Sequence, residues 1–196
     1  MRAKAREMSG GRGETGAVAY YLTVGDRLFG TAVYLRLPEP QDLVFVQRLW
    51  QDPSTMADVG GPIRRSKAEL RAWYRRMVEP GRPTDLYCLI CLRQTHRPVG
   101  EVSFHRLDRP AMSAYLNLKV MSTVRRQGYA RDALGAFLPF FFGAVGGQEL
   151  LDDISIANEA GRGTLERLGF ERDPLRQDVA LMRMTRARFE RLQLRP

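Results

Sequence analysis

Apolar and polar positions alternate along much of this chain, which is the pattern of short β-strands. The first two predicted strands cover residues 17–24 and 31–37, with a turn at Gly-Asp-Arg between them. Three further strands are separated only by short turns, which predicts an antiparallel meander, and two more lie near the C-terminus. These five strands are predicted over 86–92, 99–107, 113–121, 150–156 and 179–185.

Helical spacing of apolar residues predicts four helices between and before these strands. The first lies in PEPQDLVFVQRLWQD, and the second begins at the capping box formed by Ser66 and Glu69. A long apolar helix in ARDALGAFLPFFFGAV should kink at Pro139, and a short helix in NEAGRGTLERLG closes at a glycine. Residues 51–65 contain proline and glycine with little periodicity, which predicts a loop.

The mixed order of these elements predicts an α+β domain with about seven strands and about four helices. We expect one domain over residues 31–190, preceded by an extra strand and turn over 17–30. Residues 1–16 and 191–196 are predicted to be tails, the first of them disordered. Three successive phenylalanines, Phe140–Phe142, favour packing within the chain under the N-terminal strand over a dimer interface.

Composition narrows the class of protein. A content of 44% hydrophobic and 27% charged residues is that of a globular protein, and the net charge of +9 favours anionic partners. Cys88 and Cys91 lack a second pair to complete a zinc site, and only His96 and His105 could add imidazoles, so no metal is predicted. An apolar run long enough for a signal or a membrane span is missing, which favours the cytoplasm.

The run VMSTVRRQGYA, over residues 120–130, joins a predicted strand to a predicted helix. Free N–H groups at a helix N-terminus bind phosphate, and a glycine there lets the backbone approach the ligand closely. Arg125, Arg126 and Arg131 would add charge-assisted contacts. The run therefore predicts a phosphate cradle, with a solvated basic helix start as the alternative.

Three motifs in order make the chain resemble the GCN5-related N-acetyltransferase (GNAT) family over about residues 31–190. RRQGYA, from Arg125 to Ala130, fits the acyl-CoA motif R/Q-x-x-G-x-G/A. Asn158 is followed by Gly169 and Phe170 at the spacing of the family's closing motif. LRLPEPQD and LMRMTRARFE resemble the opening and final segments of the ribosomal-protein-alanine (Rim-like) acetyltransferases.

The resemblance implies the GNAT fold, in which the fourth and fifth family strands splay apart around the pantetheine arm of acetyl-CoA. Here those strands are the segment ending at Leu118-Lys119-Val120 and the segment 152–156. The backbone N–H near Val120 is expected to hold the thioester carbonyl and its oxyanion. The expected cofactor-binding residues are Leu118, Val120, Arg125, Arg126, Gln127, Gly128, Tyr129, Ala130, Arg131 and Asn158.

Two side chains that many GNAT relatives use for proton transfer have no counterpart here. The position of the usual glutamate is Tyr115, and the position of the usual tyrosine is Leu165. The substitutes considered are Glu101, Tyr115, His105 and the pair Asp152 and Asp153. The catalytic assignment combines Val120 with Glu101 and Tyr115, although Glu101 could also be a solvated carboxylate of the sheet edge.

We therefore expect an acetyl-CoA-dependent N-acetyltransferase in which a primary amine attacks the thioester directly. A protein or peptide amine is favoured, because an α-amino group with a pKa of about 7.7–8.0 needs less help from a base than lysine does. A small-molecule acetyltransferase, for aminoglycosides or amino acids, and a weakly active acyl-CoA-binding sensor or scaffold remain alternatives. No stable binding of nucleic acid or membrane is expected, and the protein is predicted to be a monomer or homodimer.

Overall fold

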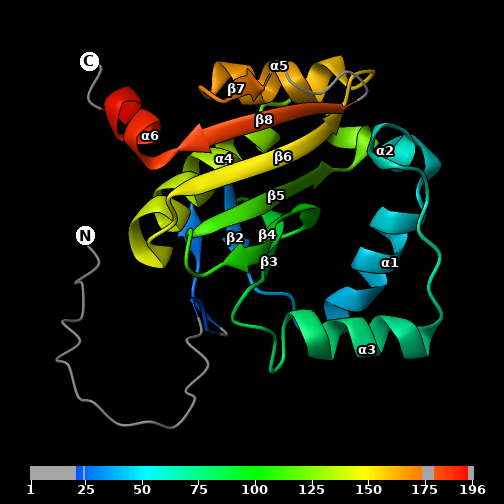
Figure 1. The fold of residues 1–196 in the computed structure, drawn as a ribbon. Coiled ribbons are helices and arrows are strands. Elements are labelled where there is room, and N and C mark those ends of the chain that lie inside the picture. Colours follow the sequence, from blue (N-terminus) through cyan, green and yellow to red (C-terminus); the bar gives the residue numbers. More distant parts are fainter. Residues whose placement is uncertain (1–20, 24, 174–178, 194–196) are drawn as a thin grey trace, which may run out of the picture.

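The computed structural model describes residues 21–23, 25–173 and 179–193. Within them, one sheet of eight strands forms the centre of the molecule, in the order β1-β2-β3-β4-β5-β6-β8-β7 (Figure 1). Neighbouring strands are antiparallel except for β5 and β6, which are parallel. The strands are β1 (Leu28–Phe29), β2 (Val33–Arg36), β3 (Leu86–Leu92), β4 (Pro98–Asp108), β5 (Ser113–Val120), β6 (Glu149–Ser155), β7 (Glu171–Asp173) and β8 (Val179–Thr185).

Helices cover both faces of this sheet. In Figure 1, α4 passes behind the sheet, whereas α1 and α3 lie to one side of it and α2 lies beside the end of β5. The helices are α1 (Leu43–Gln51), α2 (Pro53–Met56), α3 (Lys67–Met77), α4 (Tyr129–Pro139), α5 (Glu159–Arg167) and α6 (Arg186–Gln193). The predicted fold class is therefore confirmed: a mostly antiparallel mixed sheet flanked by helices.

Local sequence signals predicted most elements well. β3 and β8 have the predicted bounds, and α3 begins at the predicted capping box, where Ser66 and Glu69 bond each other's backbone N–H groups. The predicted loop over 51–65 was wrong, since it contains α2, and β7 and α6 were not predicted. Of the strand predicted over 17–24, residues 21–23 are not strand, and the remainder lies outside the described residues.

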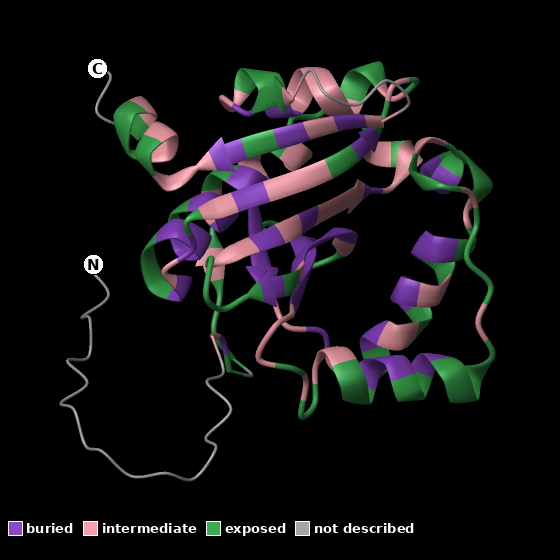
Figure 2. Cartoon of the chain, viewed as in Figure 1, coloured by how far each residue is buried: buried purple, intermediate pink, exposed green. Residues whose placement is uncertain are grey.

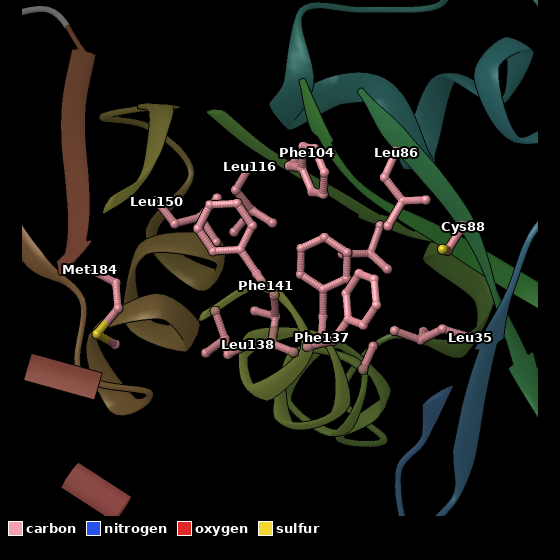
Figure 3. Packing of buried hydrophobic residues seen from close by; sticks show 14 of the residues in the cluster. Leu35, Leu86, Cys88, Phe104, Leu116, Phe137, Leu138, Phe141, Leu150 and Met184 are labelled. Atoms are coloured by element: carbon pink, nitrogen blue, oxygen red, sulfur yellow. The ribbon is translucent and has the colours of Figure 1, made fainter. Parts of the chain in front are cut away.

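Two apolar clusters lie on opposite faces of the sheet. The larger one, which α4 covers, draws its side chains from most strands; Figure 3 shows Phe104, Phe137 and Phe141 at its centre. The smaller one joins α1 and α3 to the sheet through edge-to-face contacts of Trp73 with Trp50 and Tyr87. Buried residues accordingly concentrate on the central strands and the inner sides of the helices (Figure 2).

The two cysteines are buried on the two opposite faces, as their spacing in a strand predicts. Cys88 belongs to the larger cluster and Cys91 to the smaller one, and neither is paired in a disulfide. Burial raises the pKa of both thiols, so both remain protonated and unreactive at neutral pH.

The three phenylalanines after Pro139 pack within the chain. At Pro139 the α-helical pattern gives way to a π-helical turn over Phe140–Val145, because proline cannot donate the hydrogen bond that would continue the α-helix. All three rings are buried, and Phe142 stacks on Phe189 of α6 at 4.9 Å between ring centroids. The wider turn and the unpredicted α6 together let consecutive rings find apolar partners.

Asp132 of α4 holds the beginning of β2 in place. Its carboxylate accepts hydrogen bonds from the backbone N–H groups of Thr31, Ala32 and Val33, at 2.7, 2.7 and 2.9 Å. Burial opposes its ionisation, but these donors outweigh burial and lower the pKa of Asp132. Its stabilising effect is therefore present above the pKa of the unfolded chain and is lost as pH falls through the folded value.

Replacing Asp132 by asparagine is expected to lower the free energy of unfolding by about 1.5–3 kcal/mol, because charge-assisted hydrogen bonds are lost. Urea denaturation at pH 7 measures this difference. Asp108→Asn is the matched control, since Asp108 accepts one hydrogen bond of 3.4 Å from the N–H of Ala111. Equal losses in the two variants would contradict this role for Asp132.

Candidate active site

A wedge opens between the two parallel strands at the centre of the sheet. β5 and β6 pair only at Ser113–Glu149, Ala114–Leu150 and Tyr115–Leu151, after which the strand ladder ends. A cleft of about 990 Å³ begins there and extends past α2 to the N-termini of α4 and α5. Its walls include most of β5 from Tyr115 to Val120, and β6 from Asp152 to Ser155. The predicted splaying of these two strands is confirmed.

Backbone N–H groups of β5 point into the wedge. The N–H of Met121 donates to the carbonyl oxygen of Val99 on β4, at 2.9 Å. Since successive residues of a strand direct their N–H groups to opposite edges, those of Val120 and Leu118 point away from β4 and toward β6. Beyond the last β5–β6 pair these donors face the cleft, where a ligand can accept their hydrogen bonds.

The N-terminus of α4 also lacks a side-chain cap. Ser66 caps α3 and Asn158 caps α5 with side-chain oxygens, whereas Gly128 stands at the cap position of α4. Gly128 has φ of 79°, and a Cβ built on it would meet no atom within 4 Å. Arg126, two residues earlier, also has a positive φ, of 64°. The space beside Gly128 is therefore open, and an uncapped helix start with positive φ values resembles an anion-binding backbone nest.

The predicted cradle residues divide into those that line the cleft and those that do not. Arg126, Gly128, Tyr129, Ala130 and Arg131 line it, and both arginine side chains are exposed. Gln127 is also exposed but is not among the lining residues.

The side chain of Arg125 contacts the segment around α2. Its guanidinium donates to the carbonyl oxygen of Thr55 at 2.7 Å and forms an ion pair with Asp58 at 3.2 Å. These contacts hold the segment around α2 against the cleft. Arg125 also lines the cleft, so it positions the wall of the site, and its contact with a phosphate stays a prediction.

The α2 segment is the part of the site that sequence reasoning missed. Asp52 caps α2 by accepting from the N–H groups of Ser54 and Thr55, and it also accepts from the Ser122 hydroxyl at 3.1 Å. The N–H of Ser122 in turn donates to the Thr55 hydroxyl oxygen at 2.9 Å. An aspartate followed by proline is a helix-start signal, so Asp52-Pro53 could have identified this helix.

Asn158 occupies the N-cap of α5 and lines the cleft. Its side-chain oxygen accepts from the N–H of Gly161 at 2.9 Å. This hydrogen bond orients the side chain and explains why an asparagine is suited to this position. A contact of its amide nitrogen with a cofactor stays a prediction.

Glu101 was considered as a base or as a solvated carboxylate, and it is neither exposed nor part of the cleft wall. Only 1% of the residue is exposed, and its carboxylate accepts four hydrogen bonds. Trp50 Nε1 and Lys119 Nζ donate at 2.7 Å each, Asn117 Nδ2 donates at 3.0 Å, and the Tyr87 hydroxyl completes the set. Glu101 is therefore the centre of a buried polar network beneath the cleft.

The network keeps Glu101 ionised. Burial alone would raise the pKa of Glu101, but the charge of Lys119 and the hydrogen bonds from Lys119, Tyr87 and Trp50 outweigh burial and lower it. Burial and the nearby carboxylate raise the pKa of Tyr87, so its hydroxyl stays protonated and continues to donate. A carboxylate that is this well satisfied is a weak proton acceptor, and its evident role is to position Lys119, a residue that lines the cleft.

The remaining candidates for proton transfer lie in the cleft. Tyr115 stacks on His105, with ring centroids 6.0 Å apart, and both line the wall formed by β4 and β5. Burial and the neighbouring charge of Arg106 lower the pKa of His105. Asp152 and Asp153 line the opposite wall, on β6. The structure thus brings four of the predicted candidates to one cleft and excludes Glu101 from it.

A cleft between splayed parallel strands, with an uncapped helix N-terminus at its mouth and strand N–H groups directed into it, fits an acyl-CoA-dependent transferase. Residues 32–171 match the family described as Acetyltransferase (GNAT) domain, so the chain belongs to the GNAT acetyltransferase family. No curated protein matches the sequence significantly.

Solved structures share the fold at low sequence identity. Spermidine N-acetyltransferase from Vibrio cholerae, in complex with CoA and spermine, is 18% identical with a TM-score of 0.74, covering 81% of this chain and 98% of that one. A GNAT-family acetyltransferase from Bacillus anthracis is 14% identical with a TM-score of 0.69, covering 83% and 99%. A Vibrio cholerae protein provisionally named a ribosomal-protein-serine acetyltransferase is 19% identical with a TM-score of 0.66, covering 84% and 99%.

The residues of the cleft fit acetyl-CoA, the acetyl donor of GNAT enzymes. The uncapped N–H groups of α4, the open space in front of Gly128, and the exposed Arg126 and Arg131 would hold its phosphates. The inward N–H groups of Leu118 and Val120 would hold the pantetheine arm and the thioester carbonyl. When bound, acetyl-CoA supplies an acetyl group activated as a thioester.

Within residues 21–23, 25–173 and 179–193, no group of three or more metal-ligating side chains is arranged to hold a metal ion. No helix in the same residues is long and apolar enough to cross a membrane.

Proposed function

We propose that this enzyme acetylates the α-amino group of a protein or peptide. The observation that carries the proposal is the residue at the position of the usual GNAT glutamate, which is Tyr115 in this chain. Tyr115 lines the cleft, and a tyrosine hydroxyl is a much weaker base than a carboxylate.

The proton inventory of the cleft supports the same acceptor. The position at which many GNAT relatives have a catalytic glutamate is Tyr115 in this chain. The carboxylate of Glu101 accepts hydrogen bonds from Lys119 and its other donors, so it is not available as a base. An α-amino group with a pKa of about 7.7–8.0 is already partly neutral at physiological pH, whereas lysine, at about 10.4, is almost entirely charged. The weaker basicity of the α-amine suits a cleft whose two free-standing candidates for a base, Asp152 and Asp153, lie on β6 and not at the position of the usual glutamate.

Backbone and side chains of β5 have separate roles in this proposal. The N–H groups of Leu118 and Val120 stabilise the oxyanion that develops on the thioester carbonyl during attack. The hydroxyl of Tyr115, on the adjacent wall, is the proposed donor of a proton to the departing sulfur. Arg126, Arg131 and the first turn of α4 hold the phosphates, and Asn158 lines the wall beyond them.

The structural likeness to a spermidine acetyltransferase makes a small amine the second candidate. At 18% identity that likeness shows the fold alone. A binding module without turnover, acting as an acyl-CoA sensor, is the third candidate. Turnover with any amine would exclude it.

Thiol release from acetyl-CoA distinguishes these acceptors. We expect turnover with a lysine-free peptide that has a free N-terminus, and at least tenfold less, about 1.4 kcal/mol in transition-state stabilisation, with spermidine or with an N-terminally blocked peptide carrying one lysine. The rate with the free peptide should rise between about pH 7 and pH 8.5 as its amine loses a proton. Faster reaction with spermidine would refute the proposal.

A further inference from the structure

The proposed function leaves two carboxylates of the cleft, Asp152 and Asp153, without a task, and Asp152 is the less exposed of the two. Asp152 is the first residue of β6 beyond the last pair with β5, Tyr115–Leu151, so it stands where the wedge opens. It is partly buried and lines the cleft. Unlike Glu101, which accepts four hydrogen bonds, Asp152 accepts none from the described part of the chain. A carboxylate in such surroundings is costly to keep unless it serves a ligand.

Asp152 faces the inner part of the wedge, near the N–H groups assigned to the thioester. The last pair between β5 and β6 is Tyr115–Leu151, so Leu116 is the residue of β5 at the level of Asp152. Leu118 lies two residues further along β5. At about 3.3 Å per residue, Leu118 therefore lies about 7 Å further along β5 than the level of Asp152. A proton can pass between a carboxylate and an amine through one bridging water.

The charged groups around Asp152 come from three directions. Asp153 is its neighbour on β6, and Lys119 approaches from β5. On β8 the residue opposite is the apolar Met182, and Arg126 and Arg167, near the N-terminus of α4 and in α5, line the same cleft. Burial and the charge of Asp153 raise the pKa of Asp152 to about 7, against a lowering effect of Lys119.

We propose that Asp152 removes the proton from the acceptor amine, acting as the general base of this enzyme. This inference rests on the proposed function only because it requires an acceptor amine that the enzyme acetylates. The neutral form of the amine attacks, and the carboxylate takes one proton from the nitrogen as the nitrogen bonds to the acyl carbon. The carbon–sulfur bond breaks, and the departing sulfur takes the hydroxyl proton of Tyr115, which regains a proton from solvent. Asp152 returns its proton to solvent through the cleft.

Asp152→Asn tests the assignment in the pH dependence of kcat/KM, with the amine that supports the fastest turnover. We expect kcat/KM to fall about 10²-fold or more. The increase of kcat/KM near pH 7, which reflects ionisation of Asp152, should disappear. Only the increase near about pH 8, which reflects loss of a proton by the amine, should remain. Asp152→Glu should recover part of the rate. Stabilisation of Asp152→Asn by acetyl-CoA should persist, because the phosphate cradle is intact.

Asp153→Asn is the matched control, since it removes one negative charge from the adjacent, exposed position. In this variant the increase of kcat/KM that reflects ionisation of Asp152 should move to lower pH but should not disappear. The reason is that the negative charge that raises the pKa of Asp152 is gone.

Stability provides a readout that does not depend on turnover. Because the pKa of Asp152 is higher in the folded than in the unfolded chain, its ionisation opposes folding above pH 7, and Asp152→Asn should raise Tm at pH 8. A purely structural carboxylate would give a lower Tm.

Three results would overturn the inference. An unchanged pH profile in Asp152→Asn excludes Asp152 alone and leaves the proposed function standing. A rise in KM for acetyl-CoA with normal kcat would instead make Asp152 a ligand of the cofactor arm. Absence of turnover by the wild type with every amine would remove both the proposed function and the base.

Discussion

Gly128→Glu is expected to abolish the stabilisation of this protein by acetyl-CoA. A side chain at Gly128 would enter the open space in front of the α4 N-terminus, and its carboxylate would occupy the N–H groups and repel the phosphates. At a ligand concentration of 100 Kd, the wild type should gain about 2.7 kcal/mol, which is a rise in Tm of about 5–11 °C for a chain of this size. The variant should show no rise.

Gly25→Glu is the matched control for this experiment. Gly25 also has a positive φ, of 102°, with no atom within 4 Å of a built Cβ, but it is not part of the cleft wall. Both substitutions place a non-glycine residue in the left-handed region and should cost about 1–2 kcal/mol. Only the Gly128 variant should lose the response to acetyl-CoA, and an equal response in both would remove the cradle from the proposed function.

Glu101→Gln is expected to destabilise the protein by about 3–5 kcal/mol, because it leaves the Lys119 ammonium buried beside a neutral amide. The side chain of Lys119 is only 10% exposed, so water cannot replace the lost charge. Urea denaturation at pH 7 gives the free-energy difference. A loss of less than about 1 kcal/mol, the usual value of an exposed ion pair, would show that the network contributes little.

The double variant Glu101→Gln/Lys119→Gln is the control, because it removes both charges. It should lose less free energy than the sum of the two single variants, and the difference measures their coupling. The lowered pKa of Glu101 also sets the pH dependence. Its contribution is complete above the unfolded pKa, about 4.3, and is lost as pH falls through the folded value, so the two variants should differ less from the wild type in acid.

Several parts of the site could be predicted because their physics is local. The sequence around Gly128 specifies a strand, a turn with positive φ and an uncapped helix within about ten residues, and each of these features is present. Asn158 and Ser66 likewise act on backbone groups only three residues away. Such contacts depend on neighbours in the sequence, so a motif is sufficient to find them.

Other parts could not be predicted because their partners are distant in the chain. Glu101 could be read as solvated until its donors were known, and these donors are 51, 14, 16 and 18 residues away. Arg125 carries the sequence signature of a phosphate ligand, yet its charge is used by Asp58 and the Thr55 carbonyl, 67 and 70 residues away. Both partners lie within residues 51–65, which were predicted to be a loop.

By itself the sequence determined most of the strands and helices, the family motifs and the uncapped helix start at Gly128. Period, capping and glycine conformation are properties of short segments, and they persist whatever the rest of the chain does. Only the tertiary structure decided which ionisable groups enter the cleft: it buried Glu101, tied Arg125 to α2, and left Asp152 open at the wedge. Burial and charge pairing depend on the whole fold, and these determine which carboxylate can accept a proton.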